Sequence, residues 1–204
     1  MIDLSNNIQS GVIKAQKDYT TWANVGLGHS AEYLIVANIA QKMAELKIQE
    51  KLEFIYVEQS IKELAEWDEL SEEYRKGRCD ICVEDEENYA IIEVKNTLTS
   101  KGKKYNSIIT DLKRIELFLK NKNYIKDSYI CFINANYIND KEDTDFNRNE
   151  IKEKIFKRLK YFEIDIKEKF KNLLFTISTQ IFIEETNENM IWAWQSVVIK
   201  VELK

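Results

Sequence analysis

Apolar residues recur at helical spacing in three stretches of the chain. Within residues 30–48, 105–120 and 151–170 they stand three or four positions apart, which places them on one face of a helix. Each stretch predicts an amphipathic helix that packs on a core, and Ser30 is positioned to cap the first of them. The apolar faces consist of Ala31, Leu34, Ile35, Ile39, Met43 and Leu46, then Tyr105, Ile108, Leu112, Ile115 and Leu119, and finally Ile151, Ile155, Leu159, Phe162, Ile166 and Phe170.

Other stretches are short runs of β-branched and aromatic residues, a composition typical of strands. Residues 78–83 and 89–95 are joined by the acidic sequence EDEEN and predict an antiparallel hairpin. The apolar run 128–134 suits a strand that is covered on both faces, and two final runs flank a turn-like TNEN sequence. The predicted strands are residues 52–58, 78–83, 89–95, 128–134, 173–184 and 190–203.

The order of these elements predicts an α/β domain of three layers, with a central mixed β-sheet flanked by helices. A length of 204 residues is sufficient for one core and short for two, so we expect a single domain over residues 1–204. Its core is expected at about 30–135, followed by a long helix and a hairpin within 149–204. The polar start of the chain is assigned no element. The charged stretch 61–77 is predicted to be a helical turn and a loop.

Composition narrows the class of protein. The chain is 44 % hydrophobic and 11 % aromatic, and its apolar runs extend over the whole length, which argues against intrinsic disorder. No stretch approaches the roughly 20 apolar residues that span a bilayer, and the start MIDLSNNIQSGV does not have the pattern of a signal peptide. We therefore expect a cytoplasmic protein with no membrane partner, in which the three cysteines are reduced.

The net charge of −5 argues at first against a nucleic-acid partner, because phosphate binding needs local positive charge. Its distribution changes this interpretation. Acidic side chains predominate in residues 45–93, whereas residues 95–126 are mostly basic and contain Asp111 and Glu116 as their acids. The basic segment is either a solvated face or a surface for nucleic acid. Its basic side chains are Lys95, Lys101, Lys103, Lys104, Lys113, Arg114, Lys120, Lys122 and Lys126.

Three ionisable residues lie in the strands of the predicted hairpin. Side chains alternate along a strand, so Glu93 and Lys95 project from one face together with Ile91. Asp80 joins them if the hairpin pairs it opposite Glu93, which implies a four-residue loop at 85–88 or a bulge. A shift of one residue would turn Asp80 to the other face.

Asp80 and Glu93 would then be neighbouring carboxylates, which repel each other and lose stability as charged groups when they are buried. A divalent cation removes this conflict. Carboxylate oxygens are ligands that Mg²⁺ prefers, and a bound ion lowers the pKa of a coordinated water and neutralises charge on a phosphate. Lys95 is suited to orient such a water or to stabilise the transition state.

The pattern G-R-C-D-(x12)-E-V-K in this hairpin resembles the motif of the PD-(D/E)XK nuclease superfamily, with Cys79 in place of the proline. The resemblance implies a restriction-endonuclease-like core. It implies that Asp80, Glu93 and the backbone carbonyl of Val94 hold Mg²⁺, for which Mn²⁺ can substitute. It also implies that Lys95 is the catalytic lysine.

Many members of this superfamily present a further glutamate from the first helix, and Glu32 fits that role as a ligand or catalytic residue. It lines up with Val36, Ile39 and Met43, so its carboxylate emerges beside an apolar face that should pack on the sheet. The alternative is a first-turn residue that complements the helix dipole. The resemblance covers about residues 30–135.

Additional side chains are candidates for the same site. Glu58 ends the first strand and is either a further ligand or a surface carboxylate, and Ser107, Asp111 or Arg114 on the following helix can face the site. A flexible basic loop beyond Lys95 lies where a nucleic-acid backbone would run. The candidate contacts to nucleic acid are Lys101, Lys103, Lys104, Lys113 and Arg114.

Three other motifs receive structural interpretations. Cys79 and Cys82 match half of a zinc site or a redox pair, but no second pair exists, and residues three apart on a strand face opposite sides. His29 is expected in a loop. Trp192 and Trp194 share a strand face and are expected in a core or an interface rather than in a base-stacking platform.

These observations predict an endonuclease that hydrolyses phosphodiester bonds of DNA with Mg²⁺, in restriction, repair or defence. No feature excludes RNA as the substrate. Because cleavage of a duplex needs two cuts, a homodimer is reasonable, with the C-terminal hairpin as its interface. The alternative is a catalytically inactive protein of the same fold that binds a partner protein or nucleic acid, which the net negative charge favours.

Overall fold

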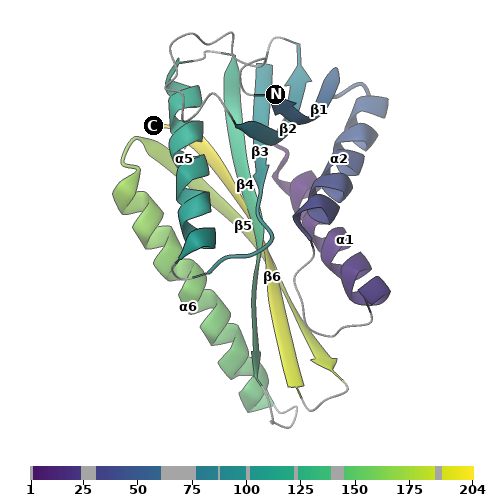
Figure 1. Cartoon of the computed structure of the whole chain (residues 1–204), viewed down its shortest axis with the longest axis vertical. Helices are drawn as coiled ribbons and strands as arrows, with labels where there is room; N and C mark the ends of the chain where they lie inside the picture. The colour runs from purple at the N-terminus through teal and green to yellow at the C-terminus, as the bar shows by residue number, and fades with distance from the viewer. Residues whose placement is uncertain are drawn as a thin grey trace.

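The computed structural model describes residues 2–23, 31–60, 77–86, 88–99, 102–121, 124–138, 145–186 and 190–204. These residues form helices and strands that alternate along the chain (Figure 1). The helices are α1 (Ser5–Ala23), α2 (Glu32–Ile48), α5 (Lys103–Asn121) and α6 (Asp145–Lys169). The strands are β1 (Phe54–Ser60), β2 (Arg78–Asp85), β3 (Asn88–Val94), β4 (Ile125–Ile138), β5 (Leu173–Thr186) and β6 (Met190–Leu203).

The strands form one sheet in the order β1-β2-β3-β4-β6-β5. Strands β3 and β4 run parallel and are connected through α5, whereas all other neighbours in the sheet are antiparallel. Helices α1 and α2 cover one face, and α5 and α6 cover the other (Figure 1). The protein is therefore a three-layer α/β structure with a mixed sheet, as the order of predicted elements indicated.

Each face of the sheet has its own hydrophobic core, because successive side chains of a strand point to opposite faces. Ile81 and Ile92 pack against the layer of α1 and α2, whereas Ile91 packs against the layer of α5 and α6. Trp192 and Trp194 are buried in the first of these cores, where Trp194 stacks on Phe182. The two tryptophans are therefore core residues.

The predicted helices and strands within the described residues are all present, and α1 is an additional element. This helix is formed by the polar segment to which the sequence assigned no structure. Its buried apolar side chains, Ile8, Val12 and Ala15, continue the helical spacing of the buried Leu4 just before the helix, but are few among polar neighbours. Gly11 allows α1 to approach α2 closely, since a Cβ atom there would lie 2.8 Å from the Cα atom of Ile39.

The start of α2 differs from the prediction. Ala31 is its N-cap and makes no side-chain capping bond, and the predicted cap, Ser30, lies outside the described residues. Glu32 is the first helical residue. The predicted turn and loop at 61–77 lie outside the described residues except for Gly77, and so does His29.

The paired residues of β2 and β3 run from Ile81 opposite Ile92 to Asp85 opposite Asn88. The predicted pair of Asp80 with Glu93 is not among them, and both residues lie just beyond the paired part of the hairpin. The connection is shorter than the expected four-residue loop, because Asp85 and Asn88 still pair and Glu86 begins the turn with a positive φ of 55°.

All three cysteines are free and buried, as expected. Cys79 and Cys82 do not face opposite sides of the sheet, however. Both belong to the core against α5 and α6, and their thiols interact. The regular alternation of side chains is broken between them, at Asp80. On the neighbouring strand β1, the residue at the position opposite Asp80 is Glu58, which has a positive φ of 54°. Within the described part of the chain, no helix has the length and apolar character needed to cross a membrane.

Candidate active site

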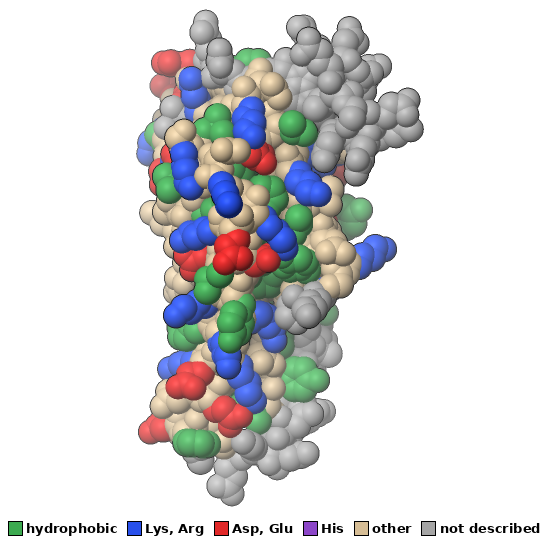
Figure 2. Space-filling model, turned by 90° about the vertical axis from the view of Figure 1, so that its left-hand side faces the viewer, with side chains coloured by type: hydrophobic (Ala, Val, Ile, Leu, Met, Phe, Trp, Pro, Cys, Tyr) green, Lys and Arg blue, Asp and Glu red, His purple; other side chains and the backbone are tan. Residues whose placement is uncertain are grey.

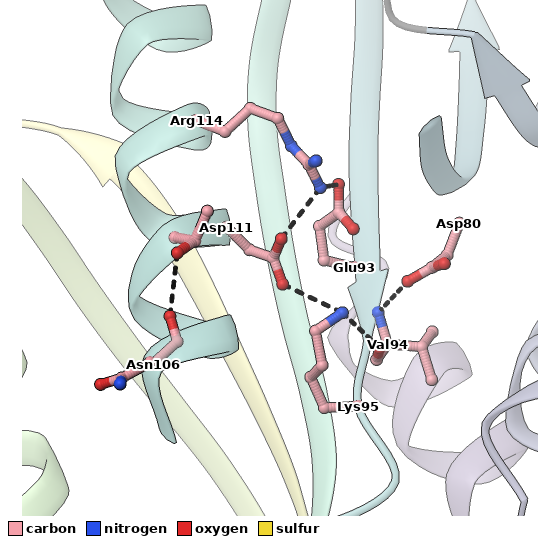
Figure 3. A network of polar contacts seen from close by, with 8 residues as sticks. Asp80, Glu93, Val94, Lys95, Asn106, Asp111 and Arg114 are labelled. Atoms are coloured by element: carbon pink, nitrogen blue, oxygen red, sulfur yellow. Dashed lines mark hydrogen bonds and ion pairs between the residues drawn. The ribbon is translucent and has the colours of Figure 1, made fainter. Parts of the chain in front are cut away.

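The predicted site residues gather at the carboxyl end of β3, where side chains from both helical layers reach the edge of the sheet. Asp80 comes from β2, Glu93 and Val94 from the end of β3, and Lys95 follows directly. Figure 3 shows Asp111 and Arg114 reaching the same place from α5. Glu32 arrives from α2, on the opposite side of the sheet.

Glu93 is the most deeply buried member of the cluster, with 1 % of its surface exposed. Its Oε1 atom accepts a hydrogen bond from Nη2 of Arg114. Burial raises the pKa of Glu93 well above its ordinary value, and the charges of Asp111 and Asp80 act in the same direction, while Arg114 opposes them. Arg114 is therefore the counter-charge that favours the ionised form of Glu93.

Lys95 lies on the same side of β3 as Glu93, as alternation predicted. Its Nζ atom is 3.0 Å from Oδ2 of Asp111 and donates to the carbonyl oxygen of Val94 at 2.9 Å. Burial lowers the pKa of Lys95, but the charges of Asp111, Asp80 and Glu93 raise the pKa by more than burial lowers it, so the net change is upward. The ammonium group is therefore held in its charged form.

Asp80 is tied to the backbone of the neighbouring strand. Its Oδ2 atom accepts a hydrogen bond of 2.6 Å from the backbone N–H of Val94 (Figure 3). Burial raises the pKa of Asp80, while this hydrogen bond and the charge of Lys95 lower it and the charge of Glu58 raises it. Glu58, which the sequence offered as either a further ligand or a surface carboxylate, is exposed but close enough for its charge to act on Asp80.

Glu32, the first residue of α2, also reaches the end of β3. Its half-buried carboxylate accepts a hydrogen bond from the backbone of Asn96, just beyond Lys95. Burial raises the pKa of Glu32, with the charge of Lys95 opposing and that of Asp80 adding to the shift. Glu32 is therefore in electrostatic contact with the other members of the cluster.

Asp111 connects the two basic residues of the site. Its Oδ1 atom accepts a hydrogen bond of 3.0 Å from Arg114, and its Oδ2 atom faces Lys95. Oδ2 is buried and has no well-aligned hydrogen bond, so its contact with Lys95 is an ion pair rather than a directed bond. One feature of the sequence indicates that Asp111 faces the interior: its carboxylate lies on the apolar face of a helix, next to Ile108 and Leu112.

The cluster contains more acidic than basic side chains. Four carboxylates, from Glu32, Asp80, Glu93 and Asp111, stand against two basic side chains, so the ionised cluster is negative overall. Burying excess negative charge is costly unless a cation offsets it. In the described residues, no group of three or more acidic, histidine or cysteine side chains is placed to hold a metal ion.

The candidate contacts to nucleic acid divide into two groups. Lys103, Lys104 and Lys113 are exposed on α5, whereas Arg114 is turned inward, with 12 % of its side chain exposed, and pairs with Glu93. Lys101 lies outside the described residues. The helix therefore presents lysines to solvent and an arginine to the site.

Comparison with protein-family models, with curated proteins and with solved structures finds no match to this chain.

Proposed function

We propose that the protein is a Mg²⁺-dependent nuclease of PD-(D/E)XK type that hydrolyses phosphodiester bonds of DNA. The observation that carries this proposal is the meeting of Asp80, Glu93, the Val94 carbonyl and Lys95 at the end of β3. The order α2-β1-β2-β3-α5-β4, with the site on the central hairpin, supports a restriction-endonuclease-like core.

In this proposal Asp80, Glu93 and the carbonyl of Val94 hold the metal ion, and Glu32 assists from α2. The ion, when bound, supplies a coordinated water of lowered pKa and neutralises charge on the scissile phosphate. Asp80 and Glu93 are suited to this role because paired strands fix their positions and the Val94 N–H orients the Asp80 carboxylate. Such hydrogen bonds to ligating groups are a common feature of metal sites.

In the same proposal, Lys95 stabilises the scissile phosphate in the transition state. Its ammonium group stays charged in the cluster and is positioned within 3.0 Å of Asp111, on the side of β3 that Glu93 shares. It donates to the Val94 carbonyl in this arrangement, so metal binding by that oxygen requires Lys95 to move toward the substrate. A charged donor beside the scissile phosphate stabilises the charge that develops in the transition state.

Arg114 and Asp111 act as positioning residues. Arg114 donates to both Glu93 and Asp111, and Asp111 in turn faces Lys95. This chain of charges opposes the effect of burial on Glu93 and keeps Lys95 beside Asp111. The two residues therefore prepare the acidic ligand and the catalytic cation without contacting substrate themselves.

The activity is tested with supercoiled plasmid incubated with the purified protein and Mg²⁺ or Mn²⁺. Cleavage is expected, with loss of activity in EDTA and a fall of roughly a hundredfold or more in Glu93→Ala and Lys95→Ala. Lys120→Ala is the matched control, because Lys120 is an exposed residue of α5 that pairs with Glu116 outside the site. Cleavage that survives both site substitutions would end the proposal. A labelled RNA tested in parallel identifies the preferred substrate.

A second candidate function is a catalytically inactive protein that binds a partner. The observation in its favour is that Lys95 and Arg114 already neutralise part of the acidic cluster. Titration calorimetry with Mn²⁺ separates the two functions. Binding that is lost in Asp80→Asn and Glu93→Gln supports the nuclease, and no binding supports the inactive protein.

A homodimer would allow cleavage of both strands of a duplex. If the C-terminal hairpin forms the dimer interface, Trp192 and Trp194 do not contribute to it, since both are core residues. Sedimentation of the protein with and without a duplex tests the dimer directly.

A further inference from the structure

A cleft of about 320 Å³ lies beside the candidate active site, between the chain that follows Lys95 and the helices α5 and α6. Its size is at the lower end of the range for small-molecule sites. It is lined by Leu98, Thr99, Tyr105, Arg158, Tyr161, Phe162, Asp165 and Lys169.

Arg158 gives the cleft an unneutralised positive charge. Its guanidinium is half-buried and donates through Nη1 to the carbonyl oxygen of Ala135 at 2.8 Å and to Oδ1 of Asn134 at 3.4 Å. Both acceptors are neutral, and among the described residues no carboxylate pairs with Arg158. Burial lowers the pKa of Arg158 and no neighbouring charge opposes that shift. Because a guanidinium remains protonated in proteins, the cleft contains a fixed cation with free donor capacity.

The other charges of the cleft largely balance each other. Lys169 donates to Asp165 at 2.7 Å and to the hydroxyl of Tyr105 at 2.6 Å, and Tyr105 and Asp165 are also hydrogen-bonded. With Lys169 and Asp165 paired, Arg158 determines the sign of the charge in the cleft. The cleft therefore favours an anionic group.

An exposed aromatic ring stands next to this cation. Tyr161 is 62 % exposed, and Phe162 and Tyr105 form the apolar wall behind it in edge-to-face contact, with ring centroids 6.1 Å apart. Nζ of Lys157 lies 5.9 Å from the centroid of the Tyr161 ring. A cation beside an aromatic surface is the combination that proteins use to bind a phosphate together with its base.

Part of the cleft lining is close along the chain to the candidate active site. Leu98 and Thr99 follow Lys95 after three and four residues, and the Leu98 N–H is hydrogen-bonded to the carbonyl oxygen of Ile133 on β4. Tyr105 lies on the helix that also carries Asp111. Figure 2 shows lysine and arginine side chains spread over this face of the molecule, which α5 and α6 form.

We infer that the cleft binds one nucleotide unit next to the scissile bond, with its phosphate on Arg158 and its base on the ring of Tyr161. This inference rests on the proposed function in so far as the nucleotide belongs to the substrate. The same chemistry is offered by a free nucleotide, and the two sources are distinguished by the probes below.

The experiment measures binding of a fluorescently labelled single-stranded oligonucleotide to the full chain in EDTA, where metal-dependent cleavage does not occur. Arg158→Gln is expected to weaken binding about tenfold and to reduce the slope of log affinity against log salt by about one. Tyr161→Ala is expected to weaken binding about tenfold and to leave the salt slope unchanged. Lys160→Gln is the matched control, since it removes one charge from a different face of α6.

Competition identifies the source of the nucleotide. Displacement of the oligonucleotide by a nucleoside monophosphate at micromolar concentration supports a site for free nucleotides, and displacement by unlabelled oligonucleotide alone supports a site for a strand. Displacement by inorganic phosphate at the same concentration would show that the cleft binds the phosphate alone and not the base.

Equal affinities for Arg158→Gln, Tyr161→Ala and Lys160→Gln would overturn the inference. Because Tyr161 is exposed, its substitution is expected to leave the fold intact even if Arg158→Gln does not. Loss of binding in the cleft variants without plasmid cleavage by the wild type would refute the proposed nuclease and leave the cleft as a nucleotide site. Plasmid cleavage by the wild type, together with oligonucleotide binding that does not depend on the cleft residues, would support the proposed nuclease and refute the nucleotide site in the cleft.

Discussion

Glu93 and Arg114 form an ion pair in the interior of the protein, with 2 % and 12 % of their side chains exposed. Removing one partner of such a pair leaves a buried charge without compensation. Arg114→Met is therefore expected to lower the free energy of unfolding by about 3–5 kcal/mol. Urea denaturation measures the loss.

The control for Arg114→Met is Lys113→Met, which changes an exposed neighbour on the same helix. Its effect is expected to stay within about 0.5 kcal/mol. Equal stabilities of the two variants would show that Arg114 does not compensate Glu93.

Asp3 provides a pH-dependent contribution to stability at the start of α1. Burial raises the pKa of Asp3, but hydrogen bonds from the side chain and backbone of Ser5, the charge of Lys200 and a hydrogen bond from Tyr129 lower it more, so that the net change is downward. A carboxyl with a depressed pKa stabilises the folded state above its unfolded pKa of about 3.9, and the contribution is lost as the pH falls through the folded value.

Asp3→Asn keeps an oxygen for the Ser5 N–H and removes the charge. The wild type is expected to be the more stable protein at pH 7 and at pH 5, by a constant difference in the free energy of unfolding. The difference should shrink at pH 3. A difference that widens toward pH 3 would show that the pKa of Asp3 is raised rather than lowered in the folded state.

At the level of single residues, the sequence was informative where geometry is local. Glu93 and Lys95 share a side of β3 because strands alternate. Asp80 lies beyond the paired residues of the hairpin and reaches the site through its hydrogen bond with the Val94 N–H. The roles of Asp111 and Arg114 depend on how α5 is placed over the sheet, which a single sequence does not specify. The contact between Cys79 and Cys82 was missed because a local irregularity at Asp80 breaks the alternation.

Among the helices, α1 and α2 depend on one glycine for their close packing. A Cβ atom at Gly11 would lie 2.8 Å from both the Cα and the Cγ1 atom of Ile39. Backbone atoms of a packed helix cannot yield as a flexible side chain does. Gly11→Ala is therefore expected to lose about 1–3 kcal/mol to overpacking, which exceeds the gain of about 1 kcal/mol in helix propensity.

Thermal denaturation tests the prediction for Gly11. Ser10→Ala is the matched control, since Ser10 is the preceding, exposed residue of α1 and gains helix propensity without a clash. A melting temperature of Gly11→Ala at or above that of Ser10→Ala would contradict the packing argument.

Element prediction succeeded where apolar periodicity is strong, as in α5, and failed for α1, where a stripe of four buried residues is interrupted by polar ones. Boundaries were less certain. β4 extends beyond the predicted 128–134 in both directions, because it pairs with β3 from Ile125 and with β6 as far as Ile138. That pairing joins residues far apart in the sequence, and no local pattern reveals it.

For the molecule as a whole, the sheet makes the predicted core and the C-terminal hairpin interdependent. β4 pairs with β6 from Ser128 to Ile138, and α1 packs on the same face as α2. A fragment of residues 30–135 would leave β4 as an unpaired edge and uncover part of one core. The fragment is expected to lack a cooperative thermal transition, which circular dichroism detects. A cooperative transition in the fragment would show that the site resides in an autonomous unit.

We propose that Asp80, Glu93 and the Val94 carbonyl form a metal centre beside Lys95. Anomalous diffraction from crystals grown with Mn²⁺ tests this proposal most directly. A peak in contact with these three groups is expected, and the same peak is expected to be absent from Glu93→Gln crystals. No peak at saturating Mn²⁺, with Lys95 still on Asp111 and Arg114 still on Glu93, would contradict it.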